Sequence, residues 1–421
     1  MSVAGIFNLV ALLITLAAAF GYVNHRWLKL PHTIGLVVIA LAVSIGILLT
    51  DVVFPRLGLE DAVRRALIDI DFEDTLMKGV LSFLLFAGAL HVDLDSLLSR
   101  RWAISILATV GILLSTVIVA GLMFFGFRAL GFDVPFVMCL VFGALISPTD
   151  PVAVMGVLKQ VEVPATLKAK IAGESLFNDG VGVVLYTVLV SLAVGGGDHG
   201  EVSFLGAAQL LLLEVVGGVA LGLGAGYLTY RAMRPINEHN LEVLITLALV
   251  MGTYACASQL HLSGPLAVVV AGLFIGNHGK RFAMSQTTRE HIDTFWSLLD
   301  ELLNSLLFLA IGFEVIAITL TGRVIGAAAL AVPVVLVARW VSVSGPIAIL
   351  GFRRQFTQGA VSVLTWGGLR GGISVALALA LPPSPEKPLL LAITYGVVLF
   401  SIIVQGLTIG SVVRRVVPTE S

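Results

Sequence analysis

Long apolar stretches follow one another along the whole chain, and they decide what it can fold into. A helix needs about 20 mostly apolar residues to cross the hydrocarbon core of a bilayer. Thirteen stretches come close to this length: 3–22, 31–50, 76–92, 102–127, 134–158, 171–194, 203–230, 241–260, 262–276, 294–318, 324–350, 357–381 and 388–413. Because lipid satisfies no backbone hydrogen bonds, such segments must be helical. The sequence therefore predicts an all-α polytopic membrane protein of about thirteen spans.

Composition supports a membrane protein and excludes several other classes. Charged residues make up 12% of the 421 residues and apolar residues 58%, whereas a soluble domain carries about a quarter charged residues. The net charge of −1 and the lack of a long basic run give no sign of a nucleic-acid partner. We expect membrane lipids as the surroundings of a single transmembrane domain that fills residues 1–421.

The basic residues orient the predicted spans. With the amino terminus outside, every inner loop carries at least two Lys or Arg residues, as the positive-inside rule requires. Adding or removing one central span would destroy this alternation. We therefore expect the amino terminus outside and the carboxyl terminus in the cytoplasm.

Two of the predicted spans are interrupted. The fifth contains Ser-Pro-Thr-Asp-Pro at 147–151, and the twelfth contains Gly-Gly-Leu-Arg-Gly-Gly at 367–372. Proline removes a backbone donor and clashes with the preceding turn, and unwound backbone at membrane depth occurs only where it is buried or lines a wet cavity. The two spans are an odd number apart, so they run in opposite directions. Paired interruptions in two inverted halves, here about 1–194 and 241–413, mark the binding site of secondary transporters.

A carboxylate lies deep in the sixth span. Asp179 follows Lys170 by nine residues, roughly 13 Å at 1.5 Å per residue, which brings it near the middle of a hydrocarbon core about 30 Å thick. An ionisable residue at this depth indicates an ion or proton path. Ser175 shares its helix face at a spacing of four residues. Together with Thr149 in the broken fifth span, these oxygens suit a dehydrated Na⁺ ion, for which a proton can compete.

Two charges beside these interruptions need a partner or a role. Arg370 cannot lose its proton, so it needs a permanent partner, and Glu174 is the predicted one in a structural ion pair between the sixth and twelfth spans. Asp150 either helps to bind the cation or neutralises the dipoles of the half-helices that meet there.

Four further polar residues lie within predicted spans. Arg339 has no partner that the sequence identifies, and we expect it in a packing or lipid-facing bridge. Asp300, Glu301 and Asn304 lie toward the inner end of their span, where we expect them to line the entrance to the site.

The motifs resemble those of the sodium/proton exchanger family, in its bacterial NhaP-type and animal NHE-type branch. The resemblance rests on 147–151, on Gly-Glu-Ser-Leu-Phe-Asn-Asp-Gly at 173–180, on Phe-Leu-Ala-Ile-Gly at 308–312 and on 368–372, and with the span count it covers almost the whole chain. It implies two crossed broken helices within a core of six spans, which packs against a dimerisation domain. It also implies a homodimer that works by an elevator-like motion, here in a bacterial plasma membrane. Many relatives carry a cytoplasmic regulatory tail, but only about eight residues follow the last span here, so we expect no soluble regulatory domain.

The resemblance also implies roles for single residues. The family's cation ligands fall on Asp179, Ser175 and Thr149, with Asp150 near the crossing, and its acid–arginine bridge falls on Glu174 and Arg370. Asn178 stands where the electrogenic relatives carry a second aspartate, and we expect it within the site that binds the cation and the proton. One titrating carboxylate implies one proton for each cation, and hence electroneutral exchange.

These features predict a secondary transporter that exchanges Na⁺ or Li⁺ for H⁺ by alternating access and so serves pH homeostasis. We expect no enzymatic activity and no cofactor besides the transported ions. Exchange of K⁺ for H⁺ is an open alternative, because oxygen ligands alone do not fix the size of the cation. A cation channel is less favoured, since no filter-like repeat occurs. An intramembrane aspartyl protease is also disfavoured, because Thr149-Asp150 and Asn178-Asp179 differ from the motifs of those enzymes.

Overall fold

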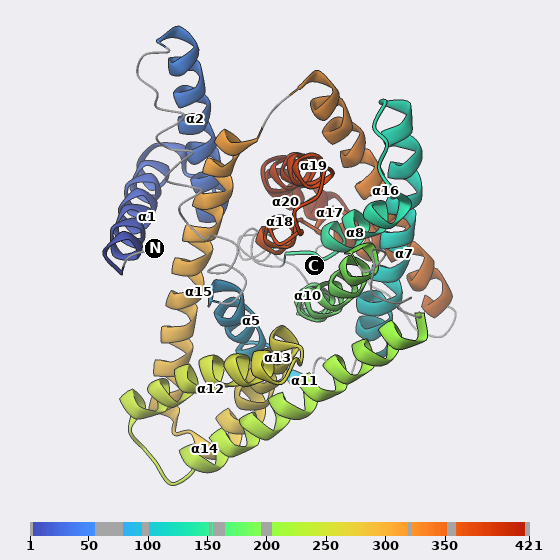
Figure 1. Cartoon of the computed structure of the whole chain (residues 1–421). Helices are drawn as coiled ribbons and strands as arrows, with labels where there is room; N and C mark the ends of the chain where they lie inside the picture. The colour runs from blue at the N-terminus through green and yellow to red at the C-terminus, as the bar shows by residue number, and fades with distance from the viewer. Residues whose placement is uncertain are drawn as a thin grey trace.

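The fold is known from a computed structural model, which describes residues 3–54, 79–94, 101–150, 154, 165–194, 204–318, 321–351 and 359–416. All regular structure in these residues is helical (Figure 1). Within this part of the chain, eight helical stretches are long and apolar enough to cross a membrane, and Leu81–Leu90 and Phe136–Ile146 are shorter apolar helices. The predicted all-α fold is confirmed, while the number of spans stays a prediction.

The helices follow the predicted spans closely. Up to residue 194 they are α1 (Val3–Val23), α2 (His32–Val53), α5 (Leu81–Leu90), α7 (Arg101–Ala129), α8 (Phe136–Ile146) and α10 (Ala165–Val194). Beyond residue 203 they are α11 (Phe204–Met233), α12 (His239–Gln259), α13 (Gly264–Phe274), α14 (Lys280–Ala283), α15 (Gln286–Glu314), α16 (Gly322–Gly351), α17 (Ala360–Trp366), α18 (Gly372–Leu379), α19 (Lys387–Phe400) and α20 (Gly406–Val416). Short π-helical turns continue α1, α13 and α19 at Asn24–Leu28, Ile275–Gly279 and Ser401–Gln405, and a 3-10 turn at Val315–Ala317 follows α15.

One helix is longer than the apolar pattern predicts. The predicted span began at residue 294, whereas α15 begins at Gln286. The side chain of Ser285 accepts a hydrogen bond from the backbone N–H of Thr288 at 3.3 Å and so caps the helix. The first turns of α15 are polar, which is why a search for apolar residues misses them.

Close approach between small residues holds the helices together. In Figure 1, α15 separates α1 and α2 from the remaining helices. The Ser44 hydroxyl of α2 donates to the Gly312 carbonyl of α15 at 2.9 Å, and a Cβ on Gly312 would overlap Ala40. α7 packs along α16 and against α8 and α10. Interfaces of small residues are typical of membrane helices, because lipid offers no hydrophobic force to drive their association.

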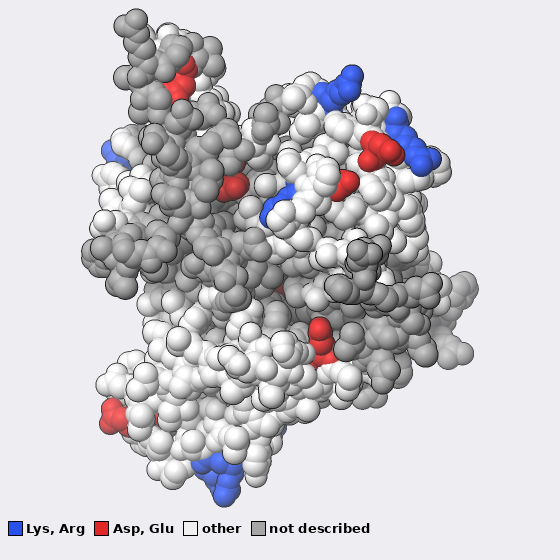
Figure 2. Space-filling view, in the orientation of Figure 1, with Lys and Arg blue, Asp and Glu red and all other residues white. Residues whose placement is uncertain are grey.

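The outer surface of the long helices is apolar. Leu49, Phe125 and Leu228 are 61%, 70% and 70% exposed, respectively. Figure 2 shows one face of the molecule, on which the described surface carries few acidic or basic side chains. Large apolar side chains at these positions are expected where lipid surrounds the helices.

Candidate functional site

The two interruptions lie where the sequence predicts them, and they touch. α8 ends at Ile146, and residues 147–150 leave the helix; Pro151 and residues 155–164 lie outside the described residues. α17 ends at Trp366 and α18 begins at Gly372, with non-helical backbone between them. The backbone N–H of Asp150 donates to the carbonyl of Leu369 at 2.8 Å. The two breaks are therefore in direct contact, while the crossing of the helices stays a prediction.

Arg370 is buried in the second break and bonds to the first. Its Nη1 donates to the carbonyl oxygens of Ser147 at 2.6 Å and Pro148 at 3.0 Å. These carbonyls lack helical partners because α8 has just ended, and a positive charge is favourable at a helix carboxyl terminus. The guanidinium thus satisfies backbone that the interruption has released.

Glu174 pairs with a different arginine from the predicted one. Its Oε1 lies 2.5 Å from Nη1 of Arg339, and both side chains are buried. Arg339 also donates from Nε and Nη2 to the carbonyl of Leu364 at 3.2 and 3.1 Å. The predicted pair of Glu174 with Arg370 is wrong: Glu174 bonds to Arg339 instead, and Nη1 of Arg370 donates to the carbonyls at the end of α8. Of the two alternatives predicted for Arg339, the packing bridge is confirmed, because its side chain is buried between Glu174 and Leu364, and the lipid-facing bridge is wrong. In the sequence, the one feature that could indicate the buried pair of Arg339 with Glu174 is that Arg339 is charged and lies within the apolar span 324–350.

Three of the predicted site residues, Thr149, Ser175 and Asn178, form one hydrogen-bonded cluster. The hydroxyls of Thr149 and Ser175 lie 3.0 Å apart. Nδ2 of Asn178 donates to Oγ1 of Thr149 at 2.7 Å, and the backbone N–H of Thr149 donates to Oδ1 of Asn178 at 3.2 Å. All three side chains are buried. Asn178 therefore fixes both the backbone and the side chain of Thr149 against α10.

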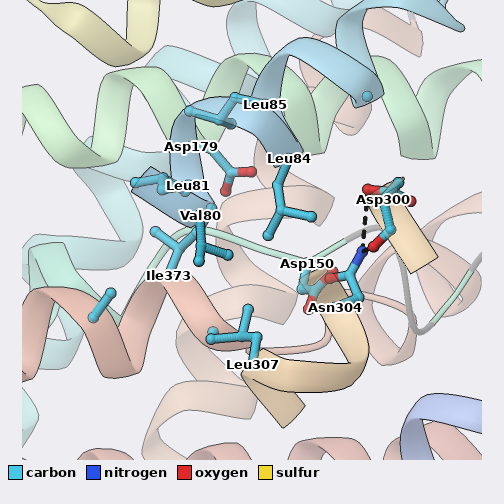
Figure 3. Close-up of a pocket in the computed structure, with 13 residues that line it drawn as sticks. Val80, Leu81, Leu84, Leu85, Asp150, Asp179, Asp300, Asn304, Leu307 and Ile373 are labelled. Carbon is cyan, nitrogen blue, oxygen red and sulfur yellow. Dashed lines mark hydrogen bonds between the residues drawn. The ribbon is translucent and has the colours of Figure 1, made fainter. Parts of the chain in front are cut away.

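Asp179 is one of the residues that line a cavity of about 110 Å³ (Figure 3). The residue is 4% exposed, and its Oδ1 accepts no hydrogen bond from the part of the chain that the structure describes. Nearly all buried polar atoms in proteins have a partner. A carboxylate oxygen left without one is suited to a proton or a cation.

Two further carboxylates and one amide line the same cavity: Asp150, Asp300 and Asn304. The remaining described lining residues are apolar or glycine. They come from α5, from Val80 directly before α5, from α15 and from α18, and include Leu81, Leu84, Leu85, Leu307 and Ile373. The described lining contains no Lys, Arg or His side chain. The volume is enough for several water molecules, and hence for a small cation with part of its hydration shell.

Asp150 sits where the cavity meets the second break. A Cβ on residue 371 would overlap the Asp150 carboxylate, so the position requires glycine. This places the carboxylate close to the start of α18, where negative charge is favourable. The position suits both roles that the sequence left open, binding the cation and neutralising the dipole.

The predicted site residues thus divide into two groups. Asp179 and Asp150 line the cavity, whereas the hydroxyls of Thr149 and Ser175 bond to each other and are not part of its described lining. Of the three predicted entrance residues, Asp300 and Asn304 line the cavity and Glu301 is exposed outside it. The leucines of α5 had no sequence signal at all, since they resemble those of any other span.

Residues 12–415 match the family described as sodium/hydrogen exchanger, transmembrane. The chain belongs to the sodium/hydrogen exchanger family. Among its relatives, the Na⁺/H⁺ antiporter NhaP of Pseudomonas aeruginosa is 46% identical over 417 residues, which cover 97% of this chain and 96% of that one. The Na⁺/H⁺ antiporter NhaH of Halobacillus dabanensis is 33% identical over 93% of each chain.

The fold of this exchanger is also that of a solved structure. The sodium proton antiporter MjNhaP1 from Methanocaldococcus jannaschii superimposes over 98% of both chains with a TM-score of 0.76, at 20% sequence identity. The resemblance inferred from the sequence motifs is therefore confirmed. This exchanger is a multi-pass membrane protein of a transporter family.

Proposed function

We propose that this exchanger moves Na⁺ or Li⁺ in exchange for H⁺ by alternating access, with Asp179 as the residue that both ions share. One observation carries the proposal: Asp179, which has a buried oxygen without a hydrogen bond from any described residue, lines a cavity where two helix interruptions meet. The names of the relatives, which are Na⁺/H⁺ antiporters, support the choice of ions.

Competition for one carboxylate is enough to couple the two ions. A bare carboxylate shut away from water is costly, and either a proton or a cation removes that cost. Positive charge already present disfavours the second ion, so the two occupy Asp179 in turn. If the cavity changes sides only when one of them is bound, each cation that crosses is matched by protons moving the other way.

Further oxygens complete the proposed cation site. Asp150 contributes from across the cavity, and the hydroxyls of Ser175 and Thr149 exchange their mutual hydrogen bond for the ion. The Na⁺ ion is substrate in this scheme, held by Asp179, Ser175 and Thr149. Asn178 positions Thr149 through the two hydrogen bonds described above.

Electroneutral exchange follows if Asp179 is the carboxylate that takes up the proton. Asn178 is a neutral amide that bonds to Thr149 and carries no proton across. One proton per cation transfers no net charge. Reversal potentials measured in proteoliposomes should not change with an imposed voltage. A voltage-dependent shift would rule out the exchange of one proton for each cation.

We also propose the assembly and placement of the exchanger. It forms a homodimer in a bacterial plasma membrane, with inverted halves at about 1–194 and 241–413, the amino terminus outside and a role in pH homeostasis. Chemical crosslinking in membranes should give a dimer. A membrane-impermeant thiol reagent should label a cysteine placed at residue 2 from outside; labelling only from inside would overturn the orientation.

Everted vesicles from an antiporter-deficient bacterium test the function. Respiration acidifies the vesicles, and a ΔpH dye reports the response to added Na⁺, Li⁺ or K⁺. Na⁺ should collapse ΔpH with wild type and with Asp133→Asn, which changes an exposed aspartate, but not with Asp179→Asn. A response to K⁺ alone would favour the K⁺/H⁺ alternative. Equal responses in wild type and Asp179→Asn, with both proteins present in the membrane, would remove Asp179 from the mechanism.

A further inference from the structure

The last helices of the chain pack against the second interruption. α17 contacts α20 and α18 contacts α19, and the four lie together in Figure 1. The π-helical turn Ser401–Gln405 joins α19 to α20, and its two end residues are buried, at 0% and 3% exposed. Single π-helical turns within α-helices occur frequently at functional sites. The exchange scheme described above assigns no role to this turn.

The side chains of Ser401 and Gln405 form a hydrogen-bonded chain between the two ends of the break. The backbone N–H of Arg370 donates to Oγ of Ser401 at 2.8 Å, and this hydroxyl donates to Oε1 of Gln405 at 2.7 Å. Nε2 of Gln405 donates to the carbonyl of Trp366 at 3.0 Å. Trp366 is the last residue of α17, where the helix end releases backbone carbonyls. The chain therefore gives partners to backbone groups on both sides of the break.

The two ends of this chain fix which group donates and which accepts. A carbonyl only accepts, so the amide nitrogen of Gln405 is turned to Trp366 and its oxygen is left for Ser401. A backbone N–H only donates, so the Ser401 hydroxyl accepts from Arg370 and gives its own proton to Gln405. Removing either side chain takes a partner from a buried backbone group, which costs more than one average hydrogen bond.

The backbone that Ser401 holds is the part of the second break that contacts the first. The side chain of Arg370 donates to the carbonyls at the end of α8. The preceding residue, Leu369, accepts the backbone N–H of Asp150 at 2.8 Å. Thr149, a proposed ligand of the cation, lies between these two contacts along the chain. A displacement of the second break is therefore passed on to the oxygens of the first.

We propose that Ser401 and Gln405 are positioning residues for the cation site, and that they act through the second break on Thr149 and Asp150. They fix how the ligands of the first break stand relative to Asp179 on α10. Selection between cations depends on the size and the flexibility of the ligand set, and a supporting shell of hydrogen bonds limits that flexibility. The two residues thus set the affinity for Na⁺ and its preference over Li⁺. This inference rests on the proposed exchange function, to which it adds residues that determine the choice of cation.

Gln405→Met tests this role, because methionine keeps the length of the side chain and removes both amide groups. In proteoliposomes with Na⁺-driven proton flux, the KM for Na⁺ should rise about fivefold, as for the loss of one hydrogen bond, and the ratio of the KM values for Li⁺ and Na⁺ should change. Ser401→Ala breaks the same chain and should act in the same direction. Thr394→Val is the matched control, since the buried Thr394 hydroxyl bonds only within α19, to the carbonyl of Leu390. Its KM values should equal those of wild type.

The double variant provides a readout that a general loss of stability would not give. Gln405→Met and Ser401→Ala interrupt one chain, so together they should raise the KM little more than the larger single effect, whereas independent effects multiply. KM values equal to wild type in both single variants, a lower maximal rate with the KM values unchanged, or multiplying effects would overturn the proposal.

Direct binding covers the case of a variant that transports nothing. Na⁺ titration of the purified protein by calorimetry then decides: weaker binding than in wild type supports the positioning role, and binding as tight as in wild type overturns it. Absence of Na⁺-driven flux in wild type would instead overturn the exchange function itself.

Discussion

Helix α10 carries two buried carboxylates, and they differ in whether they have a partner. Glu174 and Asp179 are 1% and 4% exposed. Oε1 of Glu174 lies 2.5 Å from the Arg339 guanidinium, whereas Oδ1 of Asp179 accepts no hydrogen bond from any described residue. Burial alone therefore does not separate a structural charge from a functional one; the presence of a partner does. Arg339 neutralises Glu174 within the fold, and in the proposed exchange an ion neutralises Asp179.

The largest effect is expected from breaking the partnered charge. Arg339→Met leaves Glu174 buried without the counter-charge to which it bonds and should lower the free energy of unfolding by about 3–5 kcal/mol. Unfolding of the purified protein in mixed detergent micelles measures the change.

Two further variants control this experiment. Arg323→Met, an exposed arginine on the same helix, should be nearly neutral. The double variant Glu174→Gln with Arg339→Met should recover much of the stability, since both charges are then gone. If the single variant Arg339→Met is as stable as wild type, the ion pair does not stabilise Glu174, and the proposed difference between Glu174 and Asp179 is wrong.

A smaller effect is expected at Asn178, which lies between Glu174 and Asp179 along α10. Like Glu174 it has hydrogen-bond partners, but its partner is Thr149, a proposed ligand of the same cation as Asp179. Asn178→Ala removes both hydrogen bonds between residue 178 and Thr149. The buried backbone N–H of Thr149 then loses Oδ1 of Asn178 as its acceptor. We expect a stability loss of about 1–3 kcal/mol together with slower Na⁺-driven exchange. Thermal melting and flux assays on the same preparation check both. Exchange at the wild-type rate would show that Thr149 needs no fixed position.

The smallest effect is expected at Ser175, one turn from Asp179. Ser175→Ala removes one hydroxyl, while Thr149 keeps its bond to Asn178. The loss of one neutral oxygen ligand should cost about 1 kcal/mol, which is about a fivefold rise in the KM for Na⁺ with little change in stability. Ser191→Ala, an exposed serine on the same helix, is the control. A KM equal to that of the control would remove Ser175 from the proposed ligand set.

The sequence predicted the features that local physics controls. A span needs about 20 apolar residues whatever its neighbours are, so the helices fall where expected. Pro148 and the four glycines within 367–372 interrupt helices through their own backbone chemistry, and α8 and α17 end as predicted. The depth of Asp179 in the membrane, which rests on counting along one helix, stays a prediction.

Features that depend on packing between helices could not be predicted in the same way. Which arginine meets Glu174 depends on how α10, α16 and the two breaks fit together, and the freed carbonyls of Ser147 and Pro148 could not be weighed as partners of Arg370. The cavity lining from α5 had no signal, because apolar side chains facing a cavity and facing lipid look the same in a sequence.

The most direct test of the account is the proton released when Na⁺ binds. Purified exchanger in weakly buffered detergent, with a pH dye, is titrated with Na⁺ at a pH where the site holds its proton. Because cation and proton share Asp179, we expect about one proton released for each Na⁺ bound by wild type, and none from Asp179→Asn. Na⁺ binding without proton release in wild type, or the same release from Asp179→Asn, would contradict the central claim that one carboxylate serves both ions.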